Sequence, residues 1–309
     1  MADIRVGLIG VGPMASLHAE AIQQVPGLSV GCCVSRSPDR AAAFAERHGI
    51  GAWTTLDQIG SGTDVDALWL VAPADAMASA AQELSSLGLP MFLEKPVGLS
   101  LEETQAAVRK VAAPNMVGLN RRFYEVIQTG LAICAEAGGV RAVEVHMPED
   151  LTGAAATHTD RVKAHWQFAN SVHLIDLFRL FAGEPAAVQT ANLRNNDVDR
   201  AYAGLIRFER GATGIYNAQW FAPGGWRVTV YADGVTLVYQ PIEQLTVIRR
   251  PRATEVITPS GPDSRLKPGL WAQAQAFRDF VRTGVLPPHA SDLADYERSV
   301  RLVDSLTRT

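Results

Sequence analysis

The chain has 309 residues, of which 47% are hydrophobic and 19% are charged, and its formal net charge is -4. This length can hold two domains with a sizeable core, and the composition is that of a soluble globular protein. The slightly acidic balance argues against a surface built for nucleic acid, so we expect no nucleic-acid partner.

The start of the chain and its cysteines favour a cytoplasmic location. The first residues lead directly into an apolar strand and lack the basic and apolar segments of a signal peptide. No apolar stretch approaches the roughly 18 residues that a membrane span needs, so we expect no membrane partner. Cys32, Cys33 and Cys134 contain no C-x-x-C pair, which favours reduced thiols without structural disulfides.

Strands and helices alternate through the first 120 residues. Apolar runs predict the strands, and helical periodicity with caps at Ser37 and in the Ser100–Glu103 capping box predicts the helices. The expected elements are strand 4–9, helix 13–24, strand 28–34, helix 38–48, strand 65–71, helix 76–87, strand 91–93, helix 101–112 and strand 115–119. This alternation predicts an α/β fold, with a doubly wound parallel sheet of Rossmann type over residues 1–120.

A glycine-rich turn joins the first predicted strand to the first predicted helix. It reads Gly10-x-Gly12-x-x-Ala15, with Pro13 and Met14 opening the helix. Gly10 permits the tight turn, Gly12 lets the backbone approach a pyrophosphate, and Ala15 allows close helix–strand packing. The helix N-terminus directs N–H groups and a positive dipole at phosphates. The motif therefore predicts a dinucleotide site, and the alternative is a purely structural turn.

The end of the second predicted strand indicates which nicotinamide cofactor binds. NAD-selective folds usually carry an acid there, which binds the ribose 2′-hydroxyl. This chain has Ser35, Arg36 and Ser37 instead. Arg36 can pair with a 2′-phosphate and both serines can donate hydrogen bonds to it, which favours NADP(H) over NAD(H). The alternative is that Arg36 is a solvated loop residue or stacks on adenine.

Glu94, Lys95 and Pro96 follow the fourth predicted strand. The carboxyl edge of parallel strands is where open α/β sheets bind ligands. Pro96 fixes the local backbone and biases Lys95 toward an extended conformation. A lysine at this edge can stabilise charge that develops on a substrate oxygen. Taken alone, the triplet also fits an ordinary turn.

The pattern changes after residue 120. Strand-like segments follow one another and are joined by turns at residues 209–211 and 232–234, which predicts a largely antiparallel open sheet. The expected strands are 141–147, 188–193, 202–208, 213–220, 226–231, 234–239 and 245–249, and the expected helices are 124–137, 170–181, 270–282 and 293–306. We expect an α+β domain over residues 121–309, whose closing helices could pack back on the first domain.

Five motifs, in this order and spacing, resemble the Gfo/Idh/MocA family (glucose–fructose oxidoreductase, inositol dehydrogenase and rhizopine catabolism) over essentially the whole chain. They are Gly-Leu-Ile-Gly10-Val-Gly12-Pro-Met-Ala15, the strand from Val65 to Pro73, Glu94-Lys95-Pro96, Asn120-Arg121-Arg122-Phe123 and His173-Leu-Ile-Asp176. The resemblance implies a nicotinamide-dependent oxidoreductase acting on a sugar, a cyclitol or a related polyol or ketone. It also implies a homodimer or homotetramer formed through the C-terminal sheet.

The resemblance implies roles for individual residues as well. The lysine that matches Lys95 touches both the nicotinamide ribose and a substrate hydroxyl, and the histidine that matches His173 acts as general acid and base. The expected cofactor contacts are Gly10, Gly12, Pro13, Met14, Ala15, Ser35, Arg36, Ser37, Ala72, Pro73, Glu94, Lys95 and Asn120. The expected substrate contacts are Lys95, Arg122, Tyr124, Trp166, Asn170 and His173.

One position departs from the family pattern. Many members carry an aspartate four positions before the histidine, where this chain has Ala169. Asn170 could occupy part of that space as a hydrogen-bonding amide, or it could cap the following helix. Trp166 could stack on a sugar or belong to the core, and His173 could be a core histidine. Asp176 shares a helix face with His173 and could orient it or accept from a backbone donor.

The favoured function is an NADP(H)-dependent dehydrogenase or reductase acting on CH–OH or C=O groups. One alternative is a nonredox cofactor-binding sensor or regulator, which Ala169 favours and which Lys95 and His173 oppose. Another is an enzyme that uses transient oxidation to drive elimination or glycoside cleavage. His158, Asp160, His165 and His173 lack a diagnostic metal-ligand spacing, so we expect no metal.

Overall fold

The computed structural model describes residues 3–59, 64–154, 158–195 and 200–308. The chain divides into two compact units. The first unit comprises residues 1–123 and 261–297, and the second comprises residues 124–260 and 298–309. The last helix, α10 (Leu293–Thr307), begins in the first unit and ends in the second.

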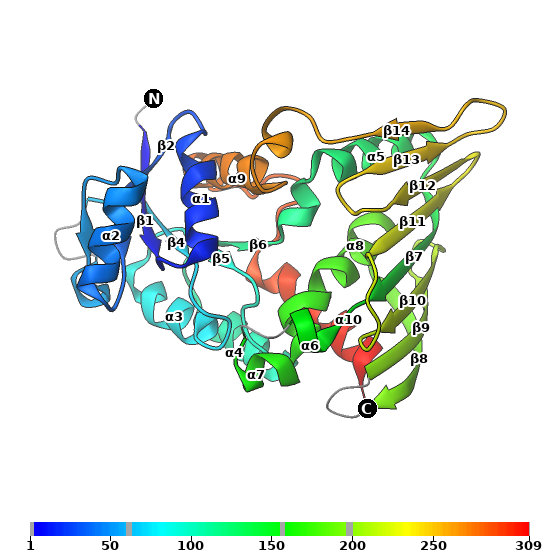
Figure 1. Ribbon diagram of the computed structural model, residues 1–309, viewed down its shortest axis with the longest axis horizontal. Helices are drawn as coiled ribbons and strands as arrows, with labels where there is room; N and C mark the ends of the chain where they lie inside the picture. The colour runs from blue at the N-terminus through cyan, green and yellow to red at the C-terminus, as the bar shows by residue number, and fades with distance from the viewer. Residues whose placement is uncertain (1–2, 60–63, 155–157, 196–199, 309) are drawn as a thin grey trace. The chain divides into compact units, whose positions relative to one another are not determined.

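Parallel strands form the centre of the first unit. Within its described residues, six strands make one sheet in the order β3-β2-β1-β4-β5-β6 (Figure 1). They are β1 (Ile4–Ile9), β2 (Leu28–Val34), β3 (Trp53–Thr54), β4 (Ala67–Leu70), β5 (Met91–Glu94) and β6 (Asn115–Gly118). The predicted doubly wound sheet is confirmed. The two-residue strand β3 was not predicted, because so short a segment carries no periodicity.

The predicted helices of the first unit form, and three of them are shorter than predicted. The helices are α1 (Pro13–Gln23), α2 (Pro38–His48), α3 (Met77–Leu84), α4 (Leu101–Lys110) and α9 (Leu270–Thr283), with 3-10 turns at η1 (Leu56–Gln58), η2 (Ser85–Leu87), η3 (Asn120–Phe123) and η5 (Gly261–Ser264). Both predicted caps are confirmed: the Oγ of Ser37 accepts from the Arg40 N–H, and that of Ser100 accepts from the Glu103 N–H. Each such cap stabilises a helix by about 1 kcal/mol.

Aromatic rings join α9 to the parallel sheet. Trp69 on β4 and Phe92 on β5 stack with their centroids 3.9 Å apart. Phe277 of α9 meets the Trp69 ring edge-on at 5.1 Å, and all three side chains are fully buried. Burying a large ring contributes ~2–3 kcal/mol, so this cluster accounts for the position of α9 on the sheet.

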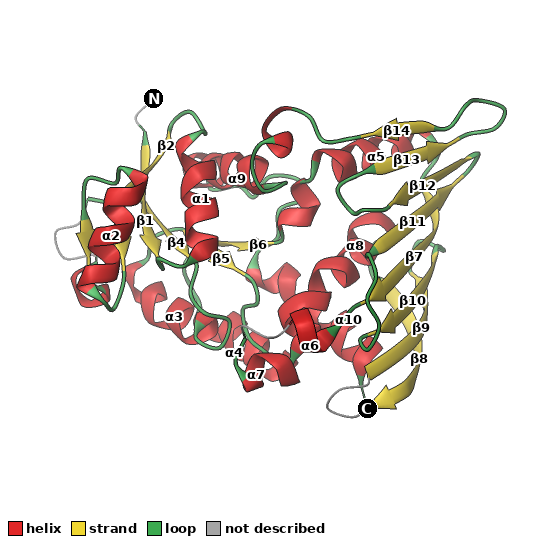
Figure 2. Cartoon of the chain, viewed as in Figure 1, coloured by secondary structure: helices red, strands yellow, loops and turns green. Residues whose placement is uncertain are grey.

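The second unit contains the larger sheet. Within the described residues, eight strands lie in the order β14-β13-β12-β11-β7-β10-β9-β8 (Figure 2). They are β7 (Val140–Pro148), β8 (Pro185–Asn195), β9 (Arg200–Phe208), β10 (Thr213–Gln219), β11 (Arg227–Ala232), β12 (Val235–Tyr239), β13 (Leu245–Ile248) and β14 (Glu255–Ile257). Neighbouring strands run antiparallel except β7 and β10, which are parallel. The largely antiparallel sheet and the two predicted turns are confirmed, whereas β14 was not predicted.

The helices of the second unit include one irregular segment. They are α5 (Glu125–Glu136), α6 (Leu151–Ala154), α7 (Asp160–Ala164), the π-helix η4 (Gln167–Ser171), α8 (Val172–Ala182) and the later part of α10. α8 packs against β7, and Gly183 follows the end of α8 with a φ of 86°. The π-helical turn occupies the start of the helix predicted for residues 170–181. π-Helical turns are rare and often occur at functional sites.

The three cysteines are buried free thiols. Burial raises the pKa of Cys33 and Cys134 to about 11, which makes both unreactive near neutral pH. In the part of the chain that the structure describes, no helix is both long and apolar enough to cross a membrane.

Gly130 allows α5 to lie close to β12, and replacing it tests this contact. A Cβ at Gly130 would overlap the hydroxyl of the fully buried Tyr239. We expect Gly130→Ala to lower the free energy of unfolding by about 1–3 kcal/mol, measured by urea denaturation. Gly225→Ala is the control, because nothing lies within 4 Å of the Cβ position there. Equal stabilities of the two variants would contradict the packing.

Candidate active site

The glycine turn after β1 leaves room for a phosphate. Gly10 has a φ of 115°, and a Cβ there would overlap the carbonyl oxygen of Val71, so this position requires glycine. At Gly12, nothing lies within 4 Å of the Cβ position. Gly12 is also the N-cap of α1 and offers no side chain to its first N–H groups. These N–H groups and the open space beside Gly12 fit the pyrophosphate of a dinucleotide.

The β2 end presents a positive charge. Arg36 is exposed, and none of the ion pairs among the described residues includes it. The Ser35 Oγ accepts from the Ser37 N–H at 3.2 Å, and the Ser37 Oγ accepts from the Arg40 N–H. Because both hydroxyls act as acceptors in these bonds, each can still donate its own hydrogen to a ligand.

The other predicted cofactor residues of the first unit follow neighbouring strands. Ala72 and Pro73 follow β4, Lys95 follows β5 and Asn120 follows β6. Since these strands are parallel, the structure brings their carboxyl ends to the same edge as the glycine turn. Lys95 is half-buried, and Asn120 is buried with its Nδ2 donating to the Pro268 carbonyl at 3.2 Å.

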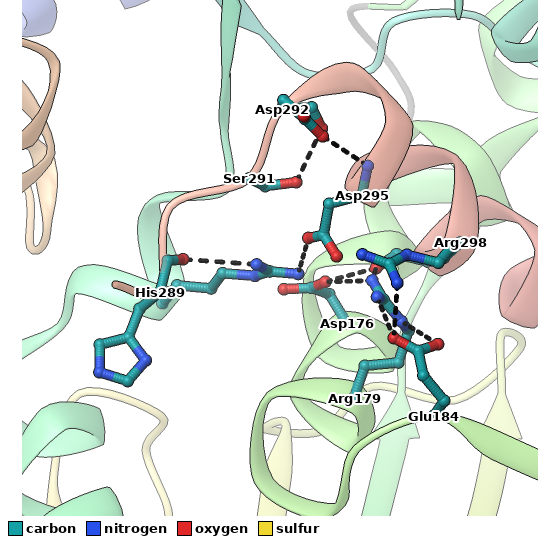
Figure 3. Close-up of polar contacts among 10 residues, drawn as sticks. Asp176, Arg179, Glu184, His289, Ser291, Asp292, Asp295 and Arg298 are labelled. Atoms are coloured by element: carbon teal, nitrogen blue, oxygen red, sulfur yellow. Dashed lines mark hydrogen bonds and ion pairs between the residues drawn. The ribbon is translucent and has the colours of Figure 1, made fainter. Parts of the chain in front are cut away.

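Arg122 is held by partners within the first unit. Its Nη2 lies 2.9 Å from Asp295 Oδ2, and its Nη1 donates to the His289 carbonyl at 3.3 Å. Asp295 lies in the first turn of α10, where its N–H donates to Asp292 at 2.7 Å (Figure 3). Burial and the charge of Arg122 lower the pKa of His289. These contacts favour a structural role for Arg122, and its contact with substrate stays a prediction.

His173 lies near the start of α8, and Asp176 connects α8 to α10. His173 is 6% exposed. Tyr124, another predicted substrate residue, is buried and is the N-cap of α5. The Ser299 hydroxyl donates to Asp176 Oδ1 at 2.5 Å and accepts from Arg179 Nη1 at 2.6 Å. The predicted structural role of Asp176 thus involves a side-chain donor on α10.

The same network continues to a carboxylate after α8. Arg179 binds Glu184 with two hydrogen bonds, of 3.1 and 2.6 Å. Arg298 lies 3.5 Å from the same carboxylate, and Figure 3 shows both arginines directed at it. Asp176 and Arg179 are buried. Removing one partner of a buried charged group leaves the other without compensation, so this network stabilises the helix that carries His173.

A buried glutamate beside the π-helix was missed by the sequence analysis. Glu149 follows β7 and is 9% exposed. Its Oε2 accepts from Trp166 Nε1 at 2.9 Å, and its Oε1 accepts from Asn170 Nδ2 at 2.7 Å. Asn170 lies within η4, so the N-cap alternative for it is wrong. Trp166 is 5% exposed, which favours its core role.

Among the described residues, no group of three or more His, Cys, Asp or Glu side chains is arranged to hold a metal ion.

Burial raises the pKa of Tyr216 above its usual value of 10.0, and the neighbouring Tyr202 and Glu149 raise it further. Above pH 10, the hydroxyl of Tyr216 therefore stays protonated in the folded state, whereas it ionises in the unfolded chain. The resulting stabilisation is complete below pH 10 and is lost as the pH rises above it. We expect tyrosinate absorbance to show no ionisation of Tyr216 before alkaline unfolding, so Tyr216→Phe should match the wild type until that point. A titration near pH 10 that disappears in Tyr216→Phe would contradict this.

The fold and the glycine turn define a dinucleotide-binding Rossmann protein with a second, α+β unit. Residues 4–119 match the family described as "Oxidoreductase family, NAD-binding Rossmann fold", and residues 135–238 match "GFO/IDH/MocA C-terminal domain". The chain belongs to the GFO/IDH/MocA family, which confirms the resemblance inferred from its motifs.

Curated relatives include inositol dehydrogenases. Inositol 2-dehydrogenase of Rhizobium meliloti (strain 1021) is 32% identical over 123 residues, covering 39% of this chain. That match spans 37% of the relative's own length. The scyllo-inositol 2-dehydrogenase (NAD(+)) of Bacillus subtilis (strain 168) is 26% identical over 312 residues, covering 92% of this chain and 88% of the relative.

Solved structures share the fold across nearly the whole chain. A dehydrogenase from Chromobacterium violaceum superposes with a TM-score of 0.85 at 18% identity, covering 99% of this chain and 95% of that one. Levoglucosan dehydrogenase, in complex with NADH and levoglucosan, gives a TM-score of 0.82 at 20% identity, with coverage of 98% and 96%. At these identities the likeness establishes the fold alone.

Proposed function

We propose that this protein is an NADP(H)-preferring oxidoreductase that moves a hydride between the nicotinamide and a carbinol or carbonyl carbon. One observation carries the proposal: the open glycine turn lies at the same edge of the parallel sheet as Lys95. The substrate class is a sugar-like or cyclic polyol or ketone. Relatives named inositol 2-dehydrogenase support this class.

Each proposed catalytic residue has a separate task. When bound, the cofactor supplies or accepts the hydride. Lys95 donates a hydrogen bond to the substrate oxygen and stabilises the negative charge that develops there. His173 takes the hydroxyl proton in oxidation and returns it in reduction.

Two substitutions test these roles. On a polyol that supports nicotinamide reduction, we expect Lys95→Ala and His173→Ala each to lower kcat by about 100- to 10,000-fold. The cofactor dissociation constant of His173→Ala should stay near that of the wild type, because His173 serves the proton transfer. Turnover that persists in both variants would remove these two residues from the mechanism.

The preference for NADP(H) rests on Arg36, Ser35 and Ser37. The exposed guanidinium and the two hydroxyls can bind a 2′-phosphate, and no carboxylate precedes Asp39 in this loop. Charge-assisted hydrogen bonds of this kind are worth about 1.5–3 kcal/mol each. The name of the Bacillus subtilis relative specifies NAD(+). The proposed preference for NADP(H) therefore rests on residues 35–37 of this chain and not on that relative.

Fluorescence titration with both reduced cofactors tests the preference. We expect tighter binding of NADPH than of NADH, and Arg36→Glu should weaken NADPH binding by roughly 10- to 100-fold with little effect on NADH. Arg210→Glu is the control, since it makes the same charge change at an exposed turn of the second unit. NADH binding as tight as that of NADPH would overturn the preference.

Glu149 supplies a carboxylate near the position where many family members have an aspartate and this chain has Ala169. We infer that Glu149 accepts hydrogen bonds from substrate hydroxyls, because Trp166 and Asn170 hold this carboxylate beside the π-helical turn that contains Ala169. It would bind the substrate without replacing His173 in proton transfer. The sensor alternative, which Ala169 favours, instead requires cofactor binding without turnover.

We expect Glu149→Gln to raise KM by roughly 10- to 100-fold, because the amide replaces one acceptor oxygen by a donor. Its kcat should change less than that of His173→Ala, and thermal unfolding should establish that the variant is folded. An unchanged KM in the folded variant would assign Glu149 to structure alone.

The outer face of the larger sheet is the proposed site of self-association. Leu205 and Ile215 pair across β9 and β10 and are 57% and 45% exposed. Neighbouring exposed apolar side chains on a sheet often mark an interface. The expected assembly is a homodimer or homotetramer.

The cytoplasmic location also stays a prediction.

A further inference from the structure

His18 is a buried histidine on α1, the helix that follows the glycine turn. The proposed chemistry does not use it. His18 is in the second turn of α1 and is fully buried. Its ring centroid lies 5.6 Å from that of Trp69 and 5.5 Å from that of Phe92. These two rings are themselves stacked, so the imidazole has a defined place between α1 and strands β4 and β5.

The nitrogen of this histidine faces the glutamate that precedes Lys95. His18 Nε2 lies 3.3 Å from Glu94 Oε2, without a hydrogen bond of standard geometry. On its other side, the Glu94 carboxylate covers Gly118 of β6, where a Cβ would come within 2.5 Å of Oε2. The carboxylate is therefore confined between an imidazole on α1 and a glycine on β6.

Packing alone does not explain the histidine. Among the described residues, His18 Nδ1 has no hydrogen-bond partner, and an unsatisfied buried polar atom costs about 1–3 kcal/mol. An apolar side chain of similar volume often stabilises a core as well as a buried polar pair does. Contacts that are long in a free enzyme can also tighten when its ligands bind.

We propose that His18 is a positioning residue for Lys95. The imidazole holds the Glu94 carboxylate, and Glu94 is the residue to which Lys95 is directly bonded in the chain. Because α1 also starts at the phosphate-binding turn, the contact fixes Lys95 relative to that turn. This inference rests on the proposed function, in which Lys95 acts on the substrate oxygen. Misplacement of a catalytic group by about 1 Å can cost ~100-fold in rate.

Two independent changes disturb the carboxylate, one from each side. We expect His18→Leu to lower kcat by about 10- to 100-fold while the cofactor dissociation constant and KM change by less than about threefold. Gly118→Ala should reproduce the loss from the β6 side by displacing the carboxylate. His18→Gln should recover most of the activity, because its amide N–H can reach the same carboxylate.

The outcomes separate this inference from the proposed function. A kcat within about twofold of the wild type in both His18→Leu and Gly118→Ala, while Lys95→Ala is inactive, overturns the role of His18 and leaves the role of Lys95 intact. Full activity of Lys95→Ala overturns the proposed function itself. If His18→Leu does not fold, as judged by circular dichroism, His18→Gln and Gly118→Ala decide: loss in Gly118→Ala with retention in His18→Gln supports the role, and any other pattern rejects it.

Discussion

The contact between Gly10 and the carbonyl of Val71 is the constraint on which the first unit's site depends. Only a residue without a Cβ can pass that carbonyl with a positive φ, and the chain then enters α1 with the open position Gly12 as its N-cap. The carboxyl ends of β1 and β4 therefore lie in direct contact, through Gly10 and Val71. The adjacent β5 and β6 place Lys95 and Asn120 at the same edge.

Buried charges in the second unit are matched rather than avoided. The buried Asp176 accepts from Ser299 on α10, the buried Glu149 accepts from Trp166 and Asn170, and the partly exposed Glu184 binds Arg179 on α8. Leaving such a carboxylate unpaired in the interior would cost several kcal/mol. The contacts of Asp176 and Arg179 therefore stabilise the helix of His173, and Glu149 lies beside the π-helical turn that precedes this helix.

Local signals predicted much of this architecture. The strands of the parallel sheet are continuous apolar runs, and the caps Ser37 and Ser100 act through bonds to residues three positions away, so a short window of sequence contains the necessary information. The two-residue strand β3 and the short β14 carry too few residues for a periodic pattern. The parallel pairing of β7 with β10 joins segments about 70 residues apart. The turn signals in the sequence predict only pairings between consecutive strands, so they could not predict this one.

The site was predicted unevenly for the same reason. Gly10, Gly12 and Glu94-Lys95-Pro96 stand in motifs and could be found from their spacing. Glu149 and His18 belong to no motif used here, because their partners Asn170 and Glu94 lie 21 and 76 positions away and only the fold brings them near. Asn170 shows the limit most clearly: its sequence context suggested a helix cap, whereas the π-helical turn directs its amide to Glu149.

Transfer of deuterium from substrate to cofactor tests the central claim most directly. The protein would be incubated with oxidised cofactor and polyols deuterated at their carbinol carbons, and the nicotinamide would then be examined by mass spectrometry. The account predicts deuterium on the nicotinamide ring with at least one cyclic or sugar-like polyol, and its loss in Lys95→Ala. A cofactor that binds tightly and stays unlabelled with every such polyol would contradict hydride transfer and indicate a sensor.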